Sequence, residues 1–169
     1  EAARQFDGLE RLICMSSESV YGLSTKIPIP EDEQLNPVSL YGASKASQEL
    51  VARAYWYTDK LPVVVTRSST LYGVSMRRTQ VVSIFLKQAV MGEPITIHGD
   101  GKQTRDMNYY LNLIDGLVLA LNNPASIGEI FNLSGGNEIS INDIAAAAVK
   151  YTGSRSQIDH VVRGTNRLF

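Results

Sequence analysis

Two short, unbroken apolar runs divide the first half of the chain, and a helical pattern lies between them. The runs are Leu12–Met15 and Pro62–Thr66, and the second is rich in β-branched valine. Such runs, without polar alternation, are typical of strands buried on both faces of a parallel sheet. From Ser44 to about Tyr57 the spacing is helical. The apolar side of that helix is expected to carry Ala46, Leu50, Val51 and Ala54.

The order strand, helix, strand predicts a crossover between two parallel strands, so both strands end at the same edge of the sheet. Ligands of open α/β sheets bind outside that edge. Ser17 and Thr70 follow the two runs. We therefore expect these two residues to be neighbours at a binding edge.

The second half of the chain predicts shorter elements separated by turns. Ser140 and Asp143 have the spacing of a capping box, which would open a helix over Ile141–Tyr151. The segment Ile158–Phe169 predicts no element. The other expected elements are a helix capped by Thr79 and ended by Gly92, a strand at Ile95–Ile97, a turn at Gly99–Gly101, a helix from about Asn112 to Leu121 that Asn112 caps, and a strand at Ile130–Leu133.

Composition narrows the class of protein without naming a function. The chain is 44% hydrophobic and 20% charged, with a net charge of −1, which gives no reason to expect nucleic acid or an anionic membrane as a partner. No apolar stretch approaches the roughly 20 residues that span a bilayer. The single cysteine, Cys14, cannot form an internal disulfide, so we expect a reducing, cytoplasmic location. No metal site is expected.

Tyr41 and Lys45 are four residues apart and would share one face of the helix. A free phenol loses its proton only near pH 10. A lysine ammonium beside it, and the positive end of a helix that starts near Ser39, would both favour the phenolate. Such a tyrosine can act as a base toward a sugar hydroxyl, with Ser17 completing the hydrogen bonding. The alternative is an exposed helical pair without function, because a bare Tyr-x-x-x-Lys is a weak signal.

The surrounding motifs strengthen the functional interpretation. They are Ser16-Ser17-Glu18-Ser19-Val20-Tyr21-Gly22, Pro37-x-x-x-Tyr41-Gly42-x-Ser44-Lys45, Thr66-Arg67-Ser68-Ser69-Thr70-Leu71-Tyr72-Gly73, Gln103-Thr104-Arg105-Asp106 and Phe131-Asn132-Leu133-Ser134-Gly135. In this order and spacing they resemble the NAD-dependent epimerase/dehydratase family, part of the extended short-chain dehydrogenases, from the first residue to about Tyr151. UDP-glucose 4-epimerase is the familiar member of this family.

The resemblance implies an α/β fold, the C-terminal part of a Rossmann-like doubly wound parallel sheet with a small α/β substrate lobe. Residues 1–73 would belong to the Rossmann-like domain and residues 74–169 mainly to the lobe, with residues about 106–134 returning to the sheet. It also implies that Ser17, Tyr41 and Lys45 are catalytic. Tyr41, Lys45 and Ser69 would contact NAD, although NADP stays open.

A UDP-sugar or another NDP-sugar is the implied substrate, and the matching positions spread along the chain. Arg105 matches an arginine that contacts the diphosphate, a role that suits its forked guanidinium; the alternative is an ion pair with Asp106. Arg163, with Asn166 after it, resembles a degraded late Arg-x-x-Asp element. The substrate-binding positions implied are Ser17, Glu18, Thr70, Gln80, His98, Arg105 and Arg163.

Among the family's reactions, 4-epimerisation is favoured. The 4,6-dehydratases carry Asp-Glu directly after the catalytic Ser/Thr, whereas here Glu18-Ser19 follows Ser17 and the second carboxylate is missing. Decarboxylases usually have Ser-Glu there. A simple 4-epimerase needs no acid or base beyond Ser17, Tyr41 and Lys45. Thr70, where asparagine is common, points weakly toward a uronate 4-epimerase.

The family's Gly-x-x-Gly-x-x-Gly dinucleotide fingerprint does not occur in the sequence. We therefore interpret the chain as lacking the N-terminal, cofactor-binding half, which would leave the strand at Leu12–Met15 with a bare edge. A homo-oligomer or a partner N-terminal half is expected to cover it. Two functions stay open beside the epimerase: a non-catalytic sugar-nucleotide-binding or interaction remnant, and an NDP-sugar dehydratase or reductase of the same family.

Overall fold

The computed structural model of the protein describes residues 2–162. The chain divides into two compact units and passes between them three times. The first unit consists of Glu1–Ser69 with Tyr110–Ser134, and the second of Thr70–Tyr109 with Gly135–Phe169. No helix among the described residues combines the length and the apolar character that crossing a membrane requires.

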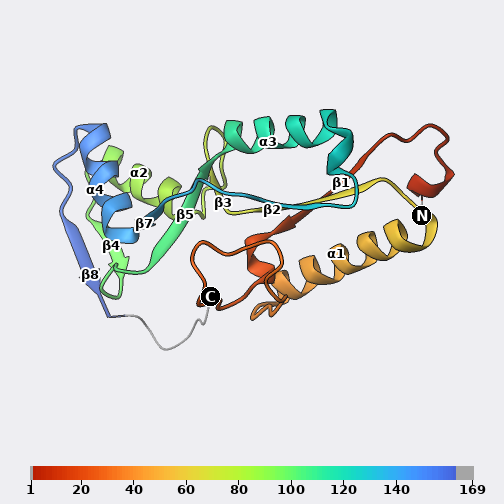
Figure 1. The fold of residues 1–169 in the computed structure, drawn as a ribbon. Coiled ribbons are helices and arrows are strands. Elements are labelled where there is room, and N and C mark those ends of the chain that lie inside the picture. The colour runs from red at the N-terminus through yellow and green to blue at the C-terminus, as the bar shows by residue number, and fades with distance from the viewer. Residues whose placement is uncertain (1, 163–169) are drawn as a thin grey trace. The chain divides into compact units, whose positions relative to one another are not determined.

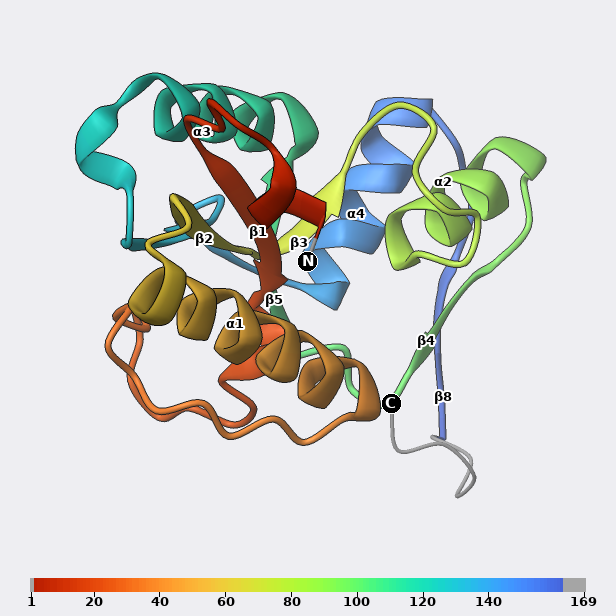
Figure 2. The same cartoon turned by 90° about the vertical axis from the view of Figure 1, so that its right-hand side faces the viewer.

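A three-stranded parallel sheet forms the centre of the first unit, in the order β1-β2-β6. Helices α1 and α3 lie on opposite faces of this sheet, as both Figure 1 and Figure 2 show. The elements are the 3-10 turn η1 (Ala2–Gln5), β1 (Leu12–Ser17), η2 (Glu18–Val20), α1 (Leu40–Asp59), β2 (Val63–Ser68), α3 (Tyr110–Asn122), η3 (Pro124–Ser126) and β6 (Ile130–Leu133).

The predicted strand–helix–strand crossover is confirmed, because β1 pairs with β2 in parallel on either side of α1 in sequence. Their carboxyl ends align, since Ser17 pairs with Ser68 and Ser68 in turn with Leu133. The α1 side of the sheet is closed by a cluster of Cys14, Val63 and Val65 with Tyr55 and Trp56 of the helix. Burial of these apolar surfaces stabilises the unit.

The predicted apolar face of α1 is partly wrong. Leu50 and Val51 are 56% and 57% exposed and Ala54 is exposed too, whereas Ala46 and the carboxylate of Glu49 are buried. The reason is electrostatic: Glu49 is turned inward by Arg67 of β2, and this rotation moves Leu50 and Val51 outward. The expected start near Ser39 is confirmed, since Ser39 Oγ accepts a hydrogen bond from Gly42 N at 3.0 Å.

Strand β1 forms one edge of its sheet, and no other described strand pairs with its outer side. Leu12 N donates to Pro62 O at 2.8 Å, so alternate residues of β1 turn their backbone groups to β2. The backbone groups of Ile13 and Met15 then face the open edge. Lys45 Nζ donates to Met15 O at 2.8 Å and occupies one of these acceptors.

The second unit contains two small sheets and two packed helices. Its core brings Phe85 and Ala89 of α2 against Ile144, Ala145 and Ala148 of α4. The elements are β3 (Thr70–Tyr72), α2 (Val81–Met91), β4 (Ile95–His98), β5 (Thr104–Tyr109), β7 (Glu138–Ser140), α4 (Ile141–Thr152) and β8 (Ile158–Val161). The sheets run β3-β5-β7 and β4-β8, and all pairs are parallel except β5 with β7.

Several predictions for these later elements are confirmed, and others are wrong. The capping box of Ser140 and Asp143 is present, and Gly92 ends α2 with a φ of 70°. However, α2 is preceded by Gln80 rather than Thr79, with no side-chain cap. Asn112 does not cap α3, because that helix begins at Tyr110, directly after β5.

Strand β8 was not expected from the sequence, because its four side chains are all exposed and show no alternation. It exists through backbone pairing with β4, in which Ile95 pairs with Ile158 and His98 with Val161. Strands β3, β5 and β7 were missed for a similar reason. They are short or carry charged and amide side chains, and pairing partners far away in sequence define them.

Candidate functional site

Ser17 is the last residue of β1 and is almost completely buried. Its Oγ accepts a hydrogen bond from Ser19 N at 3.2 Å and donates to Ser19 Oγ at 3.3 Å. The hydroxyl therefore caps the η2 turn and is held at the carboxyl end of the sheet. Glu18, the first residue of that turn, is partly buried.

Tyr41 and Lys45 lie in the first two turns of α1, at the same end of the unit. The Tyr41 side chain is 56% exposed, and its hydroxyl forms no hydrogen bond with another described residue. Lys45 Nζ donates to Met15 O at 2.8 Å and to Gln48 Oε1 at 3.1 Å. The lysine ammonium is thus held against β1, two residues before Ser17.

Gly42 explains how the first turn of α1 approaches the turn that Ser17 caps. A Cβ atom at this position would overlap the carbonyl oxygen of Ser19 and press on Pro37. Only glycine permits this contact. The structure therefore brings Ser17 together with the Tyr41–Lys45 pair, from two segments of the chain that meet at one end of β1.

Two buried hydroxyl groups lie near the same strand ends. Ser69 follows β2, and its backbone N donates to Leu133 O at 3.1 Å. The Oγ atoms of Ser69 and of Ser16 on β1 have no hydrogen-bond partner among the described residues. Buried hydroxyls without a partner are costly, so they suit an edge at which a polar ligand is received.

Of the residues expected to bind substrate, Ser17 and Glu18 lie in the first unit, and the other described ones lie in the second. Thr70 opens β3, His98 is exposed at the end of β4, and Gln80 precedes α2. The Gln80 Oε1 atom is buried without a partner among the described residues. Thr70 belongs to a different unit from Ser17, so their expected proximity stays a prediction. Arg163 lies outside the described residues.

Arg105 of β5 was expected either to bind the diphosphate or to form an ion pair with Asp106. The described residues show no such ion pair. The Arg105 side chain is exposed, and Nη1 donates only to the neighbouring Thr104 O at 2.8 Å. Asp106 instead accepts a hydrogen bond from Gly135 N at 2.7 Å. The guanidinium fork of Arg105 is thus available to an anionic ligand. Across residues 2–162, no three His, Cys, Asp or Glu side chains gather as a metal would require.

Comparison with known proteins identifies the group to which this arrangement belongs. The sequence model of the NAD dependent epimerase/dehydratase family matches residues 1–134. The chain belongs to this family.

Relatives of the chain are named for different reactions. The chain is 31% identical to the dTDP-D-glucose 4,6-dehydratase of Homo sapiens, over 94% of this chain and 46% of that protein. It is 29% identical to the uncharacterized UDP-glucose epimerase YtcB of Bacillus subtilis, over 94% of this chain and 49% of that protein. The chain therefore spans about half the length of the curated relatives it matches.

A solved structure of the family has the same fold. The UDP-glucuronic acid 4-epimerase of Bacillus cereus, in complex with UDP-glucuronic acid and NAD, superposes with a TM-score of 0.88 at 33% identity. The match covers 96% of this chain and 51% of that one. The Rossmann-like α/β class expected from the sequence is confirmed.

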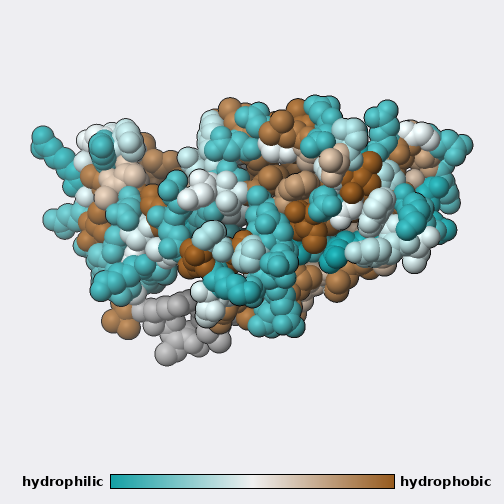
Figure 3. Space-filling view, in the orientation of Figure 1, coloured by the Kyte–Doolittle hydropathy of each residue, from teal (hydrophilic) through white to brown (hydrophobic). Residues whose placement is uncertain are grey.

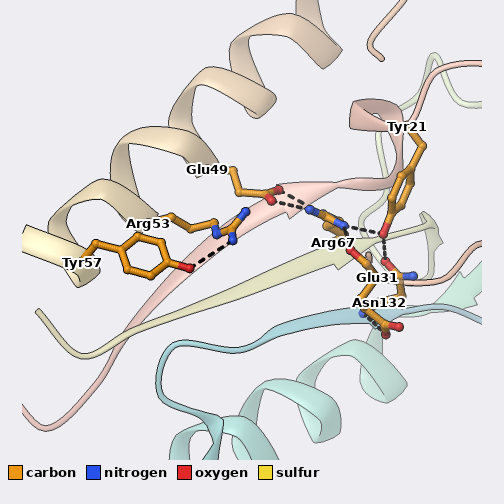
Figure 4. A network of polar contacts seen from close by, with 7 residues as sticks. All are labelled: Tyr21, Glu31, Glu49, Arg53, Tyr57, Arg67 and Asn132. Carbon is orange, nitrogen blue, oxygen red and sulfur yellow. Dashed lines mark hydrogen bonds and ion pairs between the residues drawn. The ribbon is translucent and has the colours of Figure 1, made fainter. Parts of the chain in front are cut away.

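Sequence reasoning did not foresee a polar network that joins α1 to β2 and β6 (Figure 4). Arg67 of β2 donates through Nε to Glu49 Oε2 at 3.0 Å and through Nη2 to Glu49 Oε1. Its Nη1 atom donates to Tyr21 Oη at 2.6 Å. The signal in the sequence was a charged residue, Arg67, directly after the apolar Pro62–Thr66 run and before that strand ends. A guanidinium buried there requires partners.

Burial and the bonds of the network shift the pKa values of Arg67, Tyr21 and the nearby Cys14. Burial lowers the pKa of Arg67, but the hydrogen bonds with Glu49 and Tyr21 outweigh this effect and raise it above its ordinary value. The pKa of Tyr21 is raised, chiefly by burial, although hydrogen bonds with Arg67 and Asn132 oppose the shift. Burial, with the nearby Glu49 charge, also raises the pKa of the Cys14 thiol.

These raised pKa values predict a loss of stability in alkali. The unfolded chain releases the Cys14 and Tyr21 protons at their ordinary pKa values of 9.0 and 10.0, while the folded chain retains them to higher pH. Their contribution is complete below those values and is lost as pH rises through the folded pKa. We expect the free energy of unfolding, measured in urea, to fall between about pH 9 and pH 11. Tyr21→Phe and Cys14→Ala should each flatten that fall. The exposed-tyrosine control Tyr57→Phe should keep the wild-type slope, and equal slopes in all variants would contradict the assignment.

Proposed function

We propose that this chain carries the proton-transfer site and part of the substrate site of an NAD-dependent 4-epimerase acting on a UDP-hexose or related NDP-sugar. The observation that supports this most directly is the meeting of Ser17 with Tyr41 and Lys45 at the end of β1, where Gly42 permits the close approach. Because the chain spans about half of its relatives, the whole reaction is part of the proposal.

Tyr41 is the proposed base. Tyr41 lies in the first turn of α1 with its side chain exposed, so its hydroxyl is open to a sugar hydroxyl and would take that proton as a general base. Lys45 supports this electrostatically. Its ammonium has three hydrogens, of which Met15 O and Gln48 Oε1 engage two, so one remains for a ligand. Ser17 would hydrogen-bond to the same sugar oxygen.

The residues present fit one end of NAD. Tyr41, Lys45 and Ser69 would hold the nicotinamide and its ribose, and the unpartnered hydroxyl of Ser69 offers a hydrogen bond there. When bound, the cofactor would supply the reversible oxidation of the sugar carbon. No glycine fingerprint for a pyrophosphate occurs in this sequence, so the other end would need residues from elsewhere. NADP is the alternative cofactor.

In the second unit, the proposed contacts are to the sugar nucleotide. Arg105 would donate to the diphosphate, while Thr70, Gln80 and His98 would lie along the substrate, and Arg163 is retained as a weaker candidate. The proposal also assigns residues 1–73 to the Rossmann-like domain and residues 74–169 mainly to the substrate lobe. Residues about 106–134 would return to the sheet. The solved relative that contains UDP-glucuronic acid supports a UDP-sugar.

A dehydratase is the second candidate, because the human relative is named as one. Here Glu18 is the only carboxylate directly after Ser17, and Ser19, whose Oγ accepts from Ser17, occupies the position of the second. Dehydration requires acid and base chemistry at two sugar carbons, so this substitution favours epimerisation. A reductase would consume NAD(P)H stoichiometrically, whereas an epimerase regenerates its cofactor.

The cysteine content bears on location. Cys14 is free and buried. A lone cysteine that forms no disulfide suits a reducing compartment, and we include a cytoplasmic location in the proposal.

The first test removes one oxygen atom. In whichever assembly turns over a UDP-sugar, Tyr41→Phe should lower kcat by at least about 100-fold, because general acid–base catalysis is lost. Binding of the UDP-sugar should stay within about twofold, since the ring remains. Tyr151→Phe, which alters an exposed tyrosine of the second unit, is the matched control. Undiminished turnover in Tyr41→Phe would refute the catalytic assignment.

The second test separates enzyme from binding remnant. Calorimetry should show UDP-sugar binding to the chain, and Arg105→Ala should weaken it roughly 10- to 100-fold through loss of charged hydrogen bonds to phosphate. Arg105→Lys keeps the charge without the forked guanidinium, so its affinity for the UDP-sugar should lie between those of the unaltered protein and Arg105→Ala. UDP-sugar binding without NAD binding supports the remnant; equal affinities in all three proteins would remove Arg105 from the site.

The open edge of β1 underlies a proposal about partners. Met15 on this strand is 42% exposed. Helix α3 also carries apolar side chains that its own unit leaves partly exposed, namely Leu111, Ile114, Val118 and Leu121. Apolar side chains are visible over α3 in Figure 3. An unpaired edge next to apolar surface favours association. We propose that a second copy, or a partner chain that supplies the N-terminal half, covers it.

Light scattering after size exclusion tests this association. We expect the purified chain to be a dimer or larger, and Met15→Lys to shift it toward monomer because a charge would be placed at the edge. Val162→Lys, at an exposed apolar position of the second unit, should leave the mass unchanged. A stable wild-type monomer would count against the proposal.

A further inference from the structure

Helix α1 carries a continuous series of polar side chains spaced by four residues. Tyr41, Lys45 and Glu49 occupy successive turns of one face. Tyr41 is exposed, Lys45 is partly buried and Glu49 is completely buried. The face that presents the Tyr41–Lys45 pair is therefore anchored, one turn beyond Lys45, by a buried carboxylate.

Arg67 connects that anchor to the segments on either side of it. Besides its two bonds to Glu49, its Nη1 atom donates to Tyr21 Oη at 2.6 Å and to Glu31 O at 2.8 Å. Tyr21 follows the η2 turn that Ser17 caps, and Glu31 lies in the loop leading to α1. One guanidinium thus holds the helix, the turn and the loop between them, as Figure 4 shows.

Asn132 of β6 completes the network. Tyr21 Oη donates to Asn132 Oδ1 at 2.7 Å, and Asn132 Nδ2 donates to Ile29 O at 2.8 Å. Asn132 N also donates to Glu31 Oε1 at 2.9 Å. Arg67 pairs in register with Asn132 on one side and with Ser16 on the other, so the network spans the end of the sheet.

No direct bond sets the separation of Ser17 from Tyr41. The Ser17 hydroxyl bonds within its own turn, and Lys45 bonds to Met15 O and Gln48. Three kinds of contact fix α1 against the η2 turn: the close approach at Gly42, the apolar packing of Ala46 on Val20 and Tyr21, and the bonds that radiate from Arg67. Among these, the polar bonds are the directional ones. Moving the helix along its axis or rotating it would break the pairing of Glu49 with Arg67.

We propose that Tyr21, Glu49, Arg67 and Asn132 form a positioning network that sets Ser17 against the Tyr41–Lys45 pair. The network touches no substrate; it acts through the seating of α1 and of the η2 turn. Its role in turnover rests on the proposed function, whereas its control of the Lys45 position does not.

Tyr21→Phe is the most informative variant. It removes the hydroxyl that joins Arg67 to Asn132, yet keeps the ring that lies 4.8 Å beneath the guanidinium. Glu49 variants are less suitable, because they leave a buried guanidinium unpaired and risk unfolding. Asn132→Ala is the second variant, should Tyr21→Phe not fold, since it breaks the same link from the β6 side.

The reactivity of the Lys45 amine reports the seating of α1 without requiring catalysis. Reductive methylation, followed by mass spectrometry, gives the rate at Lys45 relative to Lys87, an exposed lysine of α2. We expect Tyr21→Phe to raise this ratio roughly three- to tenfold, as weaker seating loosens the bond to Met15 O. The rise should persist unchanged in low urea, because it reflects local rather than global opening.

Tyr57→Phe is the matched control. Tyr57 lies on the same helix, and its hydroxyl meets only Arg53, at 3.5 Å. In Tyr57→Phe, the methylation rate at Lys45 relative to Lys87 should equal that of the unaltered protein. If Tyr21→Phe and Asn132→Ala lower the free energy of unfolding but leave the Lys45 ratio unchanged, the network is structural only and the proposal is overturned.

Kinetics provide the readout at the active site. In an assembly that turns over a UDP-sugar, Tyr21→Phe should lower kcat roughly three- to tenfold and leave KM within about twofold, because the second unit is unaltered. A change in KM alone would contradict positioning. If no assembly turns over while the Lys45 ratio still rises, the proposed function fails and the positioning of Lys45 stands.

Discussion

The pairing of Arg67 with Glu49 is the interaction on which the first unit depends. Both side chains are withdrawn from water, with 2% and 0% of their surface exposed. Removing two charges from water costs several kcal/mol for each, so the pair persists only because hydrogen bonds satisfy nearly every donor. Arg67 accordingly engages Glu49, Tyr21 and the Glu31 carbonyl at once. The rotation of α1, and with it the direction of Tyr41 and Lys45, follows from that requirement.

Lys45 links the open edge of β1 to the start of α1. Its ammonium occupies the Met15 carbonyl on the open edge of β1 and stands one turn from Tyr41. The bond satisfies a backbone acceptor that no described strand pairs with. In the proposed function the same ammonium stands beside the tyrosine assigned as the base. Directly after Ser17 this chain has one carboxylate, Glu18, followed by Ser19.

Much of the fold was predictable because it depends on local pattern. The two apolar runs became β1 and β2, the strand expected at Ile130–Leu133 is β6, and the Ser140–Asp143 box opens α4. The side of α1 that faces the sheet was not predictable, since a partner 18 residues away pulls Glu49 inward. Strand β8 was missed because pairing with β4, and not its own exposed side chains, defines it.

By itself, the sequence determined the α/β class, the family and the identity of the Ser17, Tyr41 and Lys45 candidates. The class follows from strand patterns that are local in the chain, whereas the family and the three candidates follow from the resemblance of its motifs. Only the tertiary structure decided that Gly42 lets α1 approach Ser19, and that Asp106 bonds to Gly135 rather than to Arg105. It also revealed the network around Arg67. A buried charge finds its partners among residues that are close in space, and that proximity is created by folding.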